Sequence, residues 1–159
     1  MLNSIRTFLS GFRVSFRQPP PATEVVTLKG NSSTQRRRPK FNQILVVDDI
    51  PRYAQSSLDA LRQFYTDFNL TVYLTYTFAD ALNAFQQYDI NLVILDLDLD
   101  DFEGDGENLL QEFLSRKPEI TVLANSSEQR YNEILLHGGA KAILAKDTDK
   151  LSQWLAQNG

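Results

Sequence analysis

Cysteine is absent from the 159 residues, which excludes disulfide bonds, thiolate nucleophiles and cysteine-ligated zinc sites. The chain also lacks an apolar run long enough to span a membrane and the compact apolar region of a secretory signal. The one histidine, His137, precedes two glycines near a predicted helix end and has no evident partner for phosphotransfer. With 42% apolar residues, the chain is expected to form one domain with its own core. Because it lacks a membrane span and a secretory signal, we expect this domain to be cytoplasmic.

Acidic residues are scarce at the start of the chain and abundant afterwards. Residues 1–40 contain eight Lys or Arg and one acid, Glu24, whereas residues 41–159 contain eight bases and nineteen acids. The net charges of the two parts are therefore +7 and −11. Because nucleic-acid backbones require a basic surface, we expect no direct nucleic-acid binding by the acidic part.

The basic part, residues 1–40, is predicted to be a flexible tail and linker. Residues 18–40 combine three consecutive prolines, a polar Ser-containing stretch and three consecutive arginines, and so have little to bury. Within residues 1–17, apolar side chains recur at helical spacing among three arginines and no acid. This segment could form an amphipathic helix that contacts an anionic membrane surface or a partner groove. A disordered basic tail and an organellar transit peptide are the alternatives.

From Phe41 onwards, short apolar runs alternate with helix-like segments. Branched apolar runs of this length are typical of buried parallel strands, and helices are predicted between them from apolar spacing and from Pro and Gly positions. The predicted strands are 44–47, 70–75, 92–95, 120–124 and 142–145, and the predicted helices are 51–64, 79–88, 107–116, 128–137 and 150–157. Five such repeats with right-handed crossovers predict a doubly wound, three-layer α/β sandwich of the flavodoxin-like type. Its five-stranded parallel sheet has the order 2-1-3-4-5.

Polar side chains follow four of the predicted strands, where each apolar run stops. They are Asp48 and Asp49, Asp96, Ser126 and Lys146. Because the C-terminal ends of parallel strands line one edge of a sheet, we expect these side chains to converge. Carboxylates about 4 Å apart repel by roughly 4 kcal/mol at an effective dielectric near 20. A divalent cation and a phosphoryl group would relieve that repulsion, so the sequence predicts a site for both.

In this order along the chain, the motifs resemble the receiver domain of bacterial two-component response regulators. The resemblance covers residues 41–159 and rests on the acidic pair Asp48-Asp49, on Asp96 after its apolar run, and on Ser126 and Lys146. It implies that Asp96 accepts a phosphoryl group from a sensor histidine kinase or a histidine phosphotransfer protein. It also implies that self-phosphorylation requires Mg²⁺ and that the acyl phosphate is lost by autodephosphorylation.

The resemblance also implies roles for the neighbouring groups. Mg²⁺ would be held by Asp48, Asp49, Asp96 and the main-chain carbonyl of Asp98, a hydrated oxygen environment that suits this ion. Lys146 would neutralise phosphoryl charge from the other side. Ser126 would donate a hydrogen bond to the phosphoryl group, and its inward movement is the usual switch of the family.

Three positions depart from the family pattern. Asp147 follows Lys146 where proline is usual, so a trans peptide bond and an extra acid near the phosphoryl group are expected. Ile143 takes the position of the aromatic residue that normally moves with Ser126, and Asp100 replaces a common proline. These departures affect the predicted output more than the predicted phosphorylation.

Two other function classes fit part of this pattern. A pseudo-receiver that binds a protein without phosphorylation remains open because of Ile143 and Asp147. A haloacid-dehalogenase-like phosphohydrolase is suggested by the Asp96-Leu97-Asp98 motif, but in that family the nucleophile precedes the acidic pair, and the order is reversed in this chain. We expect a stand-alone response regulator that signals through phosphorylation-dependent contact with a protein target or acts as a phosphate reservoir in a relay. A homodimer is left open.

Overall fold

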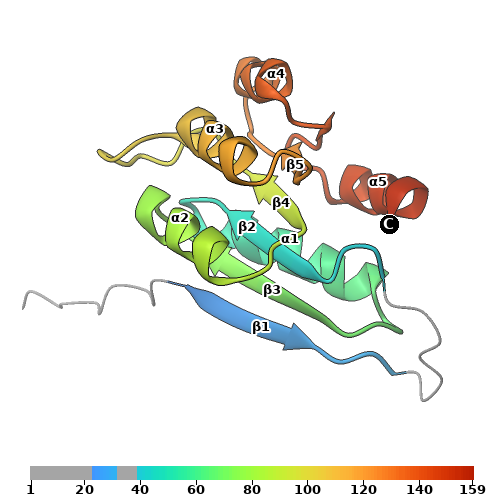
Figure 1. Cartoon of the computed structure of the whole chain (residues 1–159). Helices are drawn as coiled ribbons and strands as arrows, with labels where there is room; N and C mark the ends of the chain where they lie inside the picture. The colour runs from blue at the N-terminus through green and yellow to red at the C-terminus, as the bar shows by residue number, and fades with distance from the viewer. Residues whose placement is uncertain (1–22, 32–38) are drawn as a thin grey trace, which may run out of the picture.

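One six-stranded sheet with helices on both faces forms the centre of the computed structural model, which describes residues 23–31 and 39–159 (Figure 1). The strands are β1 (Glu24–Leu28), β2 (Gln43–Val47), β3 (Leu70–Thr75), β4 (Leu92–Leu95), β5 (Thr121–Ala124) and β6 (Ala142–Ile143). The helices are α1 (Pro51–Phe64), α2 (Phe78–Gln87), α3 (Gly106–Arg116), α4 (Gln129–Gly138) and α5 (Thr148–Asn158). The order of the strands in the sheet is β1-β3-β2-β4-β5-β6, and the last five strands in this order are parallel. The predicted doubly wound α/β fold and its strand order are confirmed, with one strand added at the edge.

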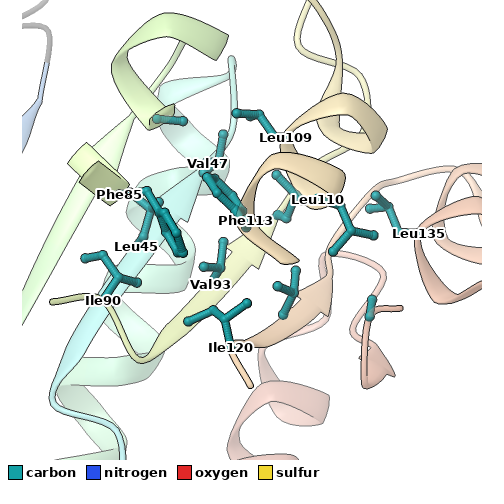
Figure 2. Packing of buried hydrophobic residues seen from close by; sticks show 14 of the residues in the cluster. Leu45, Val47, Phe85, Ile90, Val93, Leu109, Leu110, Phe113, Ile120 and Leu135 are labelled. Carbon is teal, nitrogen blue, oxygen red and sulfur yellow. The ribbon is translucent and has the colours of Figure 1, made fainter. Parts of the chain in front are cut away.

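Side chains of the central strands point alternately into two apolar cores. In β2, Leu45 and Val47 face the core beneath α2, α3 and α4, whereas Ile44 and Val46 face the core beneath α1 and α5. In the first core, Phe113 is fully buried and stacks on Phe85 from α2, with ring centroids 4.3 Å apart (Figure 2). Burial on both faces explains why the strands read as uninterrupted apolar runs.

Side-chain caps mark the starts of α2, α3 and α5, which differ from the predicted starts by one or two residues. The Thr77 hydroxyl accepts the Asp80 N–H at 3.2 Å, so α2 starts at Phe78. Asp147 caps α5, which therefore starts at Thr148, two residues before the predicted start. A capping side chain provides an acceptor for main-chain N–H groups that have no partner within the helix, and apolar periodicity does not detect it.

The prediction of a flexible segment over residues 18–40 is wrong for residues 24–28, which form β1. This strand pairs antiparallel with β3, with Val26 opposite Val72. Val26 and Leu28 pack against the core of α1 and α5, whereas Val25 and Thr27 are exposed. The period-2 alternation was present in the sequence, but the Pro-, Ser- and Arg-rich surroundings outweighed it.

The chain after β1 is fastened to the loop between α1 and β3. Gly30 N–H donates to the Asn69 side-chain oxygen at 2.9 Å, and Asn31 N–H donates to the Thr66 carbonyl at 2.9 Å. A Cβ at Gly30 would lie 2.4 Å from the Asp67 carbonyl carbon. The added strand is therefore packed against the domain at a point where only glycine fits.

Residues 1–22 and 32–38 lie outside the described part, so the predicted amphipathic or transit segment over residues 1–17 falls there. Among the described helices, none combines the length and the apolar character needed to cross a membrane.

We predict that Gly30→Ala lowers the free energy of unfolding by about 1–3 kcal/mol, the usual cost of forcing an extra carbon into a packed site. Urea unfolding of the full chain measures this. Lys29→Ala, at the neighbouring exposed position, is the control and should change stability by less than about 0.5 kcal/mol. Equal stability of both variants and the wild type would contradict the packing of β1 described above.

Candidate functional site

Two aspartates are placed by the ends of neighbouring parallel strands. The sheet ladder continues one residue beyond each strand: Asp48 N–H donates to the Thr75 carbonyl at 3.1 Å, and Asp96 N–H donates to the Val47 carbonyl at 2.9 Å. Asp48 and Asp96 are buried, with exposed fractions of 1% and 5%, and Asp49 is half-buried. One carboxylate oxygen from each of these three acids lies within 4.8 Å of the others. The structure thus brings the three predicted carboxylates together.

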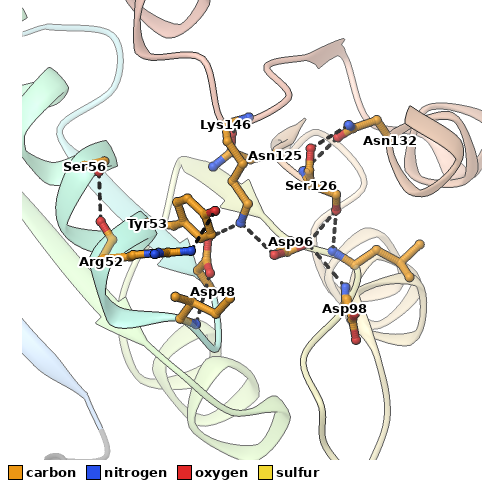
Figure 3. A network of polar contacts seen from close by, with 12 residues as sticks. Asp48, Arg52, Tyr53, Ser56, Asp96, Asp98, Asn125, Ser126, Asn132 and Lys146 are labelled. Atoms are coloured by element: carbon orange, nitrogen blue, oxygen red, sulfur yellow. Dashed lines mark hydrogen bonds and ion pairs between the residues drawn. The ribbon is translucent and has the colours of Figure 1, made fainter. Parts of the chain in front are cut away.

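Lys146 extends its ammonium group between two of these acids (Figure 3). Its Nζ donates to Asp96 Oδ2 at 2.6 Å and to the Asp48 carboxylate, and the side chain is only 9% exposed. The same ammonium lies 4.7 Å from the centre of the Tyr53 ring, a cation–π distance. Two carboxylates and one aromatic ring therefore fix the position of this cation.

Ser126 contacts the other oxygen of Asp96. The serine is fully buried, its hydroxyl donates to Asp96 Oδ1 at 2.5 Å, and the same hydroxyl accepts the Leu97 N–H at 2.9 Å. Asp98 N–H also donates to Asp96 Oδ1, at 3.3 Å, while the Asp98 side chain is exposed. Both oxygens of Asp96 are thus engaged, one by Ser126 and Asp98 and the other by Lys146. This arrangement favours Asp96 over Asp98 as the reactive carboxylate.

Burial leaves this cluster with an excess of negative charge, because three carboxylates face one ammonium. The pKa of Asp48 is raised to about 6; burial is the main cause, the hydrogen bond and charge of Lys146 oppose it, and the charge of Asp96 adds to it. Burial also raises the pKa of Asp49, and the charges of Asp96 and Asp98 reinforce that effect. Lys146 therefore compensates only part of the repulsion, and the site is suited to a further cation.

A tight turn presents Lys146 where the family pattern would have Lys-Pro. Ala145 and Lys146 have φ of 57° and 59°, and Asp147 N–H donates to the Leu144 carbonyl at 3.2 Å. Positive φ at both central residues is typical of a type I′ turn, which costs non-glycine residues roughly 1–2 kcal/mol each. Asn125 supports the turn, since its side-chain oxygen accepts the Lys146 N–H at 2.9 Å. The described residues contain no cis peptide bond, so the expected trans bond after Lys146 is confirmed.

Asp147, expected as an extra acid near the phosphoryl group, has a structural use. Its carboxylate accepts the N–H groups of Asp149 and Lys150 at 2.9 and 3.2 Å and so caps α5. The cap and the turn together replace the proline that usually follows the lysine.

The acidic loop after β4 also uses its carboxylates structurally. Asp101 accepts the Phe78 N–H at 2.8 Å at the start of α2, and Asp105 caps α3. Asp100 has a φ of 42° and an exposed side chain. Asp101 and Asp105 thus accept main-chain N–H groups at the starts of α2 and α3.

Gly106 brings the first turn of α3 close to the main chain of Asp96. A Cβ at Gly106 would lie 2.1 Å from the Asp96 carbonyl oxygen and 2.6 Å from Leu97 Cα. Gly106 N–H donates to the Leu97 carbonyl at 2.8 Å. Only glycine allows this close approach next to Asp96.

Sequence reasoning missed three side chains that hold the predicted ones in place. Asn125 supports the Lys146 turn, Tyr53 lies against the Lys146 ammonium, and Asn132 binds the main chain of Ser126. Asn125 could have been found, because it directly follows an apolar run as the other site residues do. Tyr53 and Asn132 lie within helices, and no sequence signal separates them from ordinary helix residues.

The comparisons with known proteins agree with this geometry. Residues 44–155 match the response regulator receiver domain family, and this match spans well over half of the chain. The chain therefore belongs to the receiver domain family of two-component systems, with an acidic pocket formed by Asp48, Asp49 and Asp96. Membership implies a histidine kinase as partner. Among curated proteins, none matches the chain significantly.

Solved receiver structures share the fold at low sequence identity. The receiver domain of NtrX from Brucella abortus is 22% identical, with 73% of this chain and 99% of that chain covered and a TM-score of 0.60. A CheY-like receiver protein from Methanospirillum hungatei JF-1 is 18% identical, with 75% and 99% covered and a TM-score of 0.53. The BeF3-activated receiver domain of DrrB is 21% identical, with 74% and 96% covered and a TM-score of 0.58. These likenesses support the fold.

We predict that the stability of the metal-free protein depends on pH through Asp48. Its native pKa of about 6 exceeds the ordinary value of 3.8, so its contribution to stability is fully present below pH 3.8 and is lost as the pH rises through about 6. Asp48→Asn imitates the neutral acid. The difference in free energy of unfolding between this variant and wild type should therefore be about 1–2 kcal/mol more favourable to the variant at pH 7.5 than at pH 5.

Urea unfolding in the presence of a chelator at both pH values provides the measurement. Asp59→Asn, on the exposed surface of α1, should show no such pH-dependent difference. A stability difference for Asp48→Asn that is the same at both pH values would contradict the raised pKa.

Proposed function

We propose that this protein is a response regulator whose receiver domain accepts a phosphoryl group on Asp96 from a phosphohistidine. The observation that carries the proposal is the pair of contacts to Asp96: Ser126 on one oxygen and Lys146 on the other, with two more carboxylates alongside. Transfer of a phosphoryl group requires mainly positioning and charge neutralisation, and this cluster can supply both.

In the proposed reaction, a carboxylate oxygen of Asp96 attacks the phosphorus of the donor phosphohistidine. The P–O bond forms as the P–N bond breaks, and the electron pair of the P–N bond stays with the imidazole nitrogen. The Lys146 ammonium, already 2.6 Å from Asp96 Oδ2, can then pair with the phosphoryl oxygens. The Ser126 hydroxyl can transfer its donated hydrogen bond to one of them. Attack of water on the phosphorus later regenerates the carboxylate and releases inorganic phosphate.

The carboxylates of Asp48, Asp49 and Asp96 fit Mg²⁺, because this ion takes hard oxygen ligands and is commonly bound through a few carboxylates and water. We expect the main-chain carbonyl of Asp98 to add a further oxygen. When bound, the ion would neutralise phosphoryl charge on the side opposite Lys146. The need for such a cation follows from the excess negative charge of three carboxylates beside one ammonium.

The expected partners are a sensor histidine kinase or a histidine phosphotransfer protein and a downstream protein target. Direct binding of nucleic acid by the receiver is not expected, since residues 41–159 carry a net charge of −11. Signalling would then depend on a phosphorylation-dependent protein contact. The alternative function is a binding module that acts without phosphorylation. This alternative would be favoured if Asp96 accepted no phosphoryl group in the following experiment.

We predict that acetyl phosphate and Mg²⁺ add one phosphoryl group to the full chain, as measured by intact mass. Asp96→Asn should abolish the adduct, because the amide cannot form the acyl phosphate. Asp98→Asn is the matched control: this exposed acid lies two residues away, so the variant should retain the adduct. An adduct that persists in Asp96→Asn, or no adduct in wild type, would refute the assignment.

We also predict that Mg²⁺ stabilises the protein at pH 7.5 without any phosphodonor. A ligand at a concentration of 100 Kd contributes about 2.7 kcal/mol, which raises the Tm of a domain of this size by several degrees. Thermal unfolding with and without Mg²⁺ measures the shift. The shift should be small or absent in Asp49→Asn and unchanged in Asp59→Asn, so an equal rise in all three proteins would argue against a site at the triad.

A further inference from the structure

The side chain of Asn132 pairs with the main chain of the serine that contacts Asp96. Asn132 lies in α4 and is fully buried. Its Oδ1 accepts the Ser126 N–H at 2.8 Å, and its Nδ2 donates to the Ser126 carbonyl at 2.8 Å (Figure 3). Nδ2 also donates to the Glu128 carbonyl at 3.1 Å. One amide thus satisfies both main-chain groups of one residue, as a neighbouring strand would.

Among the described strands, no pairing extends to Ser126. The pairing of β5 with β4 ends at Ala124, and its pairing with β6 ends at the same residue. Asn125 N–H still reaches the Leu95 carbonyl, at 2.8 Å, but the main-chain bonds of Ser126 go to Asn132. Because the site is buried, loss of the amide would leave a donor and an acceptor without partners.

Asparagine is the side chain that suits this position. It offers an acceptor and a donor on one short planar group, as the two bonds to Ser126 require. Aspartate would place a carboxylate against the Ser126 carbonyl, and alanine would make neither bond. A side-chain amide that pairs with buried main-chain groups in this way restricts both partners.

The contacts form a continuous path from α4 to the reactive carboxylate. Asn132 holds the main chain of Ser126, and the Ser126 hydroxyl is held by Leu97 N–H and donates to Asp96 at 2.5 Å. At the position where the family pattern has a mobile aromatic, Ile143 is partly buried and packs against the core of α2, α3 and α4. The path through Asn132 therefore consists of hydrogen bonds and requires no aromatic side chain.

We propose that Asn132 is a positioning residue that couples phosphorylation of Asp96 to α4 through the main chain of Ser126. The inference rests on the proposed phosphorylation of Asp96. When the phosphoryl group forms, the Ser126 hydroxyl has to move its donated bond from the carboxylate to a phosphoryl oxygen. Because both main-chain groups of Ser126 are bound to Asn132, that movement is passed to the first turns of α4. The Asn132 amide is thus the link that a mobile aromatic would otherwise supply.

The experiment compares hydrogen–deuterium exchange of the full chain with and without beryllofluoride and Mg²⁺, a phosphoryl analogue. The proteins are the wild type, Asn132→Ala, Ser126→Ala and Asn91→Ala. Ser126→Ala removes the hydroxyl but leaves the two main-chain bonds to Asn132, so it tests the path even if Asn132→Ala folds poorly. Asn91→Ala is the matched control, because the Asn91 side chain accepts the Asn42 and Gln43 N–H groups, each at 3.2 Å, next to the opposite ends of the strands.

In wild type and in Asn91→Ala, we expect the analogue to protect residues 95–99 and to change amide exchange in residues 129–138 about fivefold to tenfold, the factor that one hydrogen bond of ordinary net strength controls. In Asn132→Ala, protection of residues 95–99 should persist while the change in α4 falls below about twofold. In Ser126→Ala, which also lacks the acceptor of the Leu97 N–H, the change in α4 should likewise fall below about twofold.

A response of α4 in Asn132→Ala or Ser126→Ala equal to that of wild type would overturn the coupling. So would protection around Asp96 in wild type without any change in α4. Absence of protection around Asp96 in wild type would instead overturn the proposed phosphorylation, and the coupling with it. The readout is a difference caused by the analogue, so a variant that is only less stable does not imitate the expected result.

Discussion

The buried charge imbalance at the ends of β2 and β4 is the constraint on which the rest of the site depends. Asp48 and Asp96 leave the sheet at adjacent strand ends and are almost fully buried, and Lys146 lies between them. An ion pair in this position is stabilising only if the desolvation of its members is well compensated. With Asp49 nearby, one ammonium cannot compensate three carboxylates, and the raised pKa of Asp48 reflects this. The cluster therefore favours ligands that add positive charge beside the carboxylates.

The surrounding structure holds Lys146 in this strained position. Two consecutive non-glycine residues with positive φ, Ala145 and Lys146, are unfavourable, and such strain persists only where neighbouring contacts determine the backbone. Asn125 provides one such contact and the cap at Asp147 another. The ammonium is then fixed by Asp48, Asp96 and the face of Tyr53. A turn and a helix cap thus position the lysine in a chain that has no proline after it.

Much of the fold could be predicted because the strands are buried on both faces. Their apolar runs are uninterrupted, so the polar residues after each run, such as Asp48, Asp96 and the pair Asn125-Ser126, mark one edge of the sheet. Strand β1 was missed because it is a half-exposed edge strand, whose weak alternation is easily outweighed by Pro and Arg in its neighbourhood. Helix caps explain the differences in helix starts: the Asp147 side chain caps α5, so this helix starts earlier than its apolar periodicity indicates.

Contacts that depend on the relative placement of two elements could not be read from the sequence. Asn132 lies six residues after Ser126, and whether its amide meets the Ser126 main chain depends on how α4 leaves the end of β5. The pattern of the helix marks Leu135 as a core residue, but it gives no reason to expect a fully buried amide one turn earlier. A buried polar group is tolerated when all its partners are present, and it then selects one arrangement of its neighbours over others. For this reason the amide that binds the main chain of Ser126 is visible only in three dimensions, although it is as buried as the core around it.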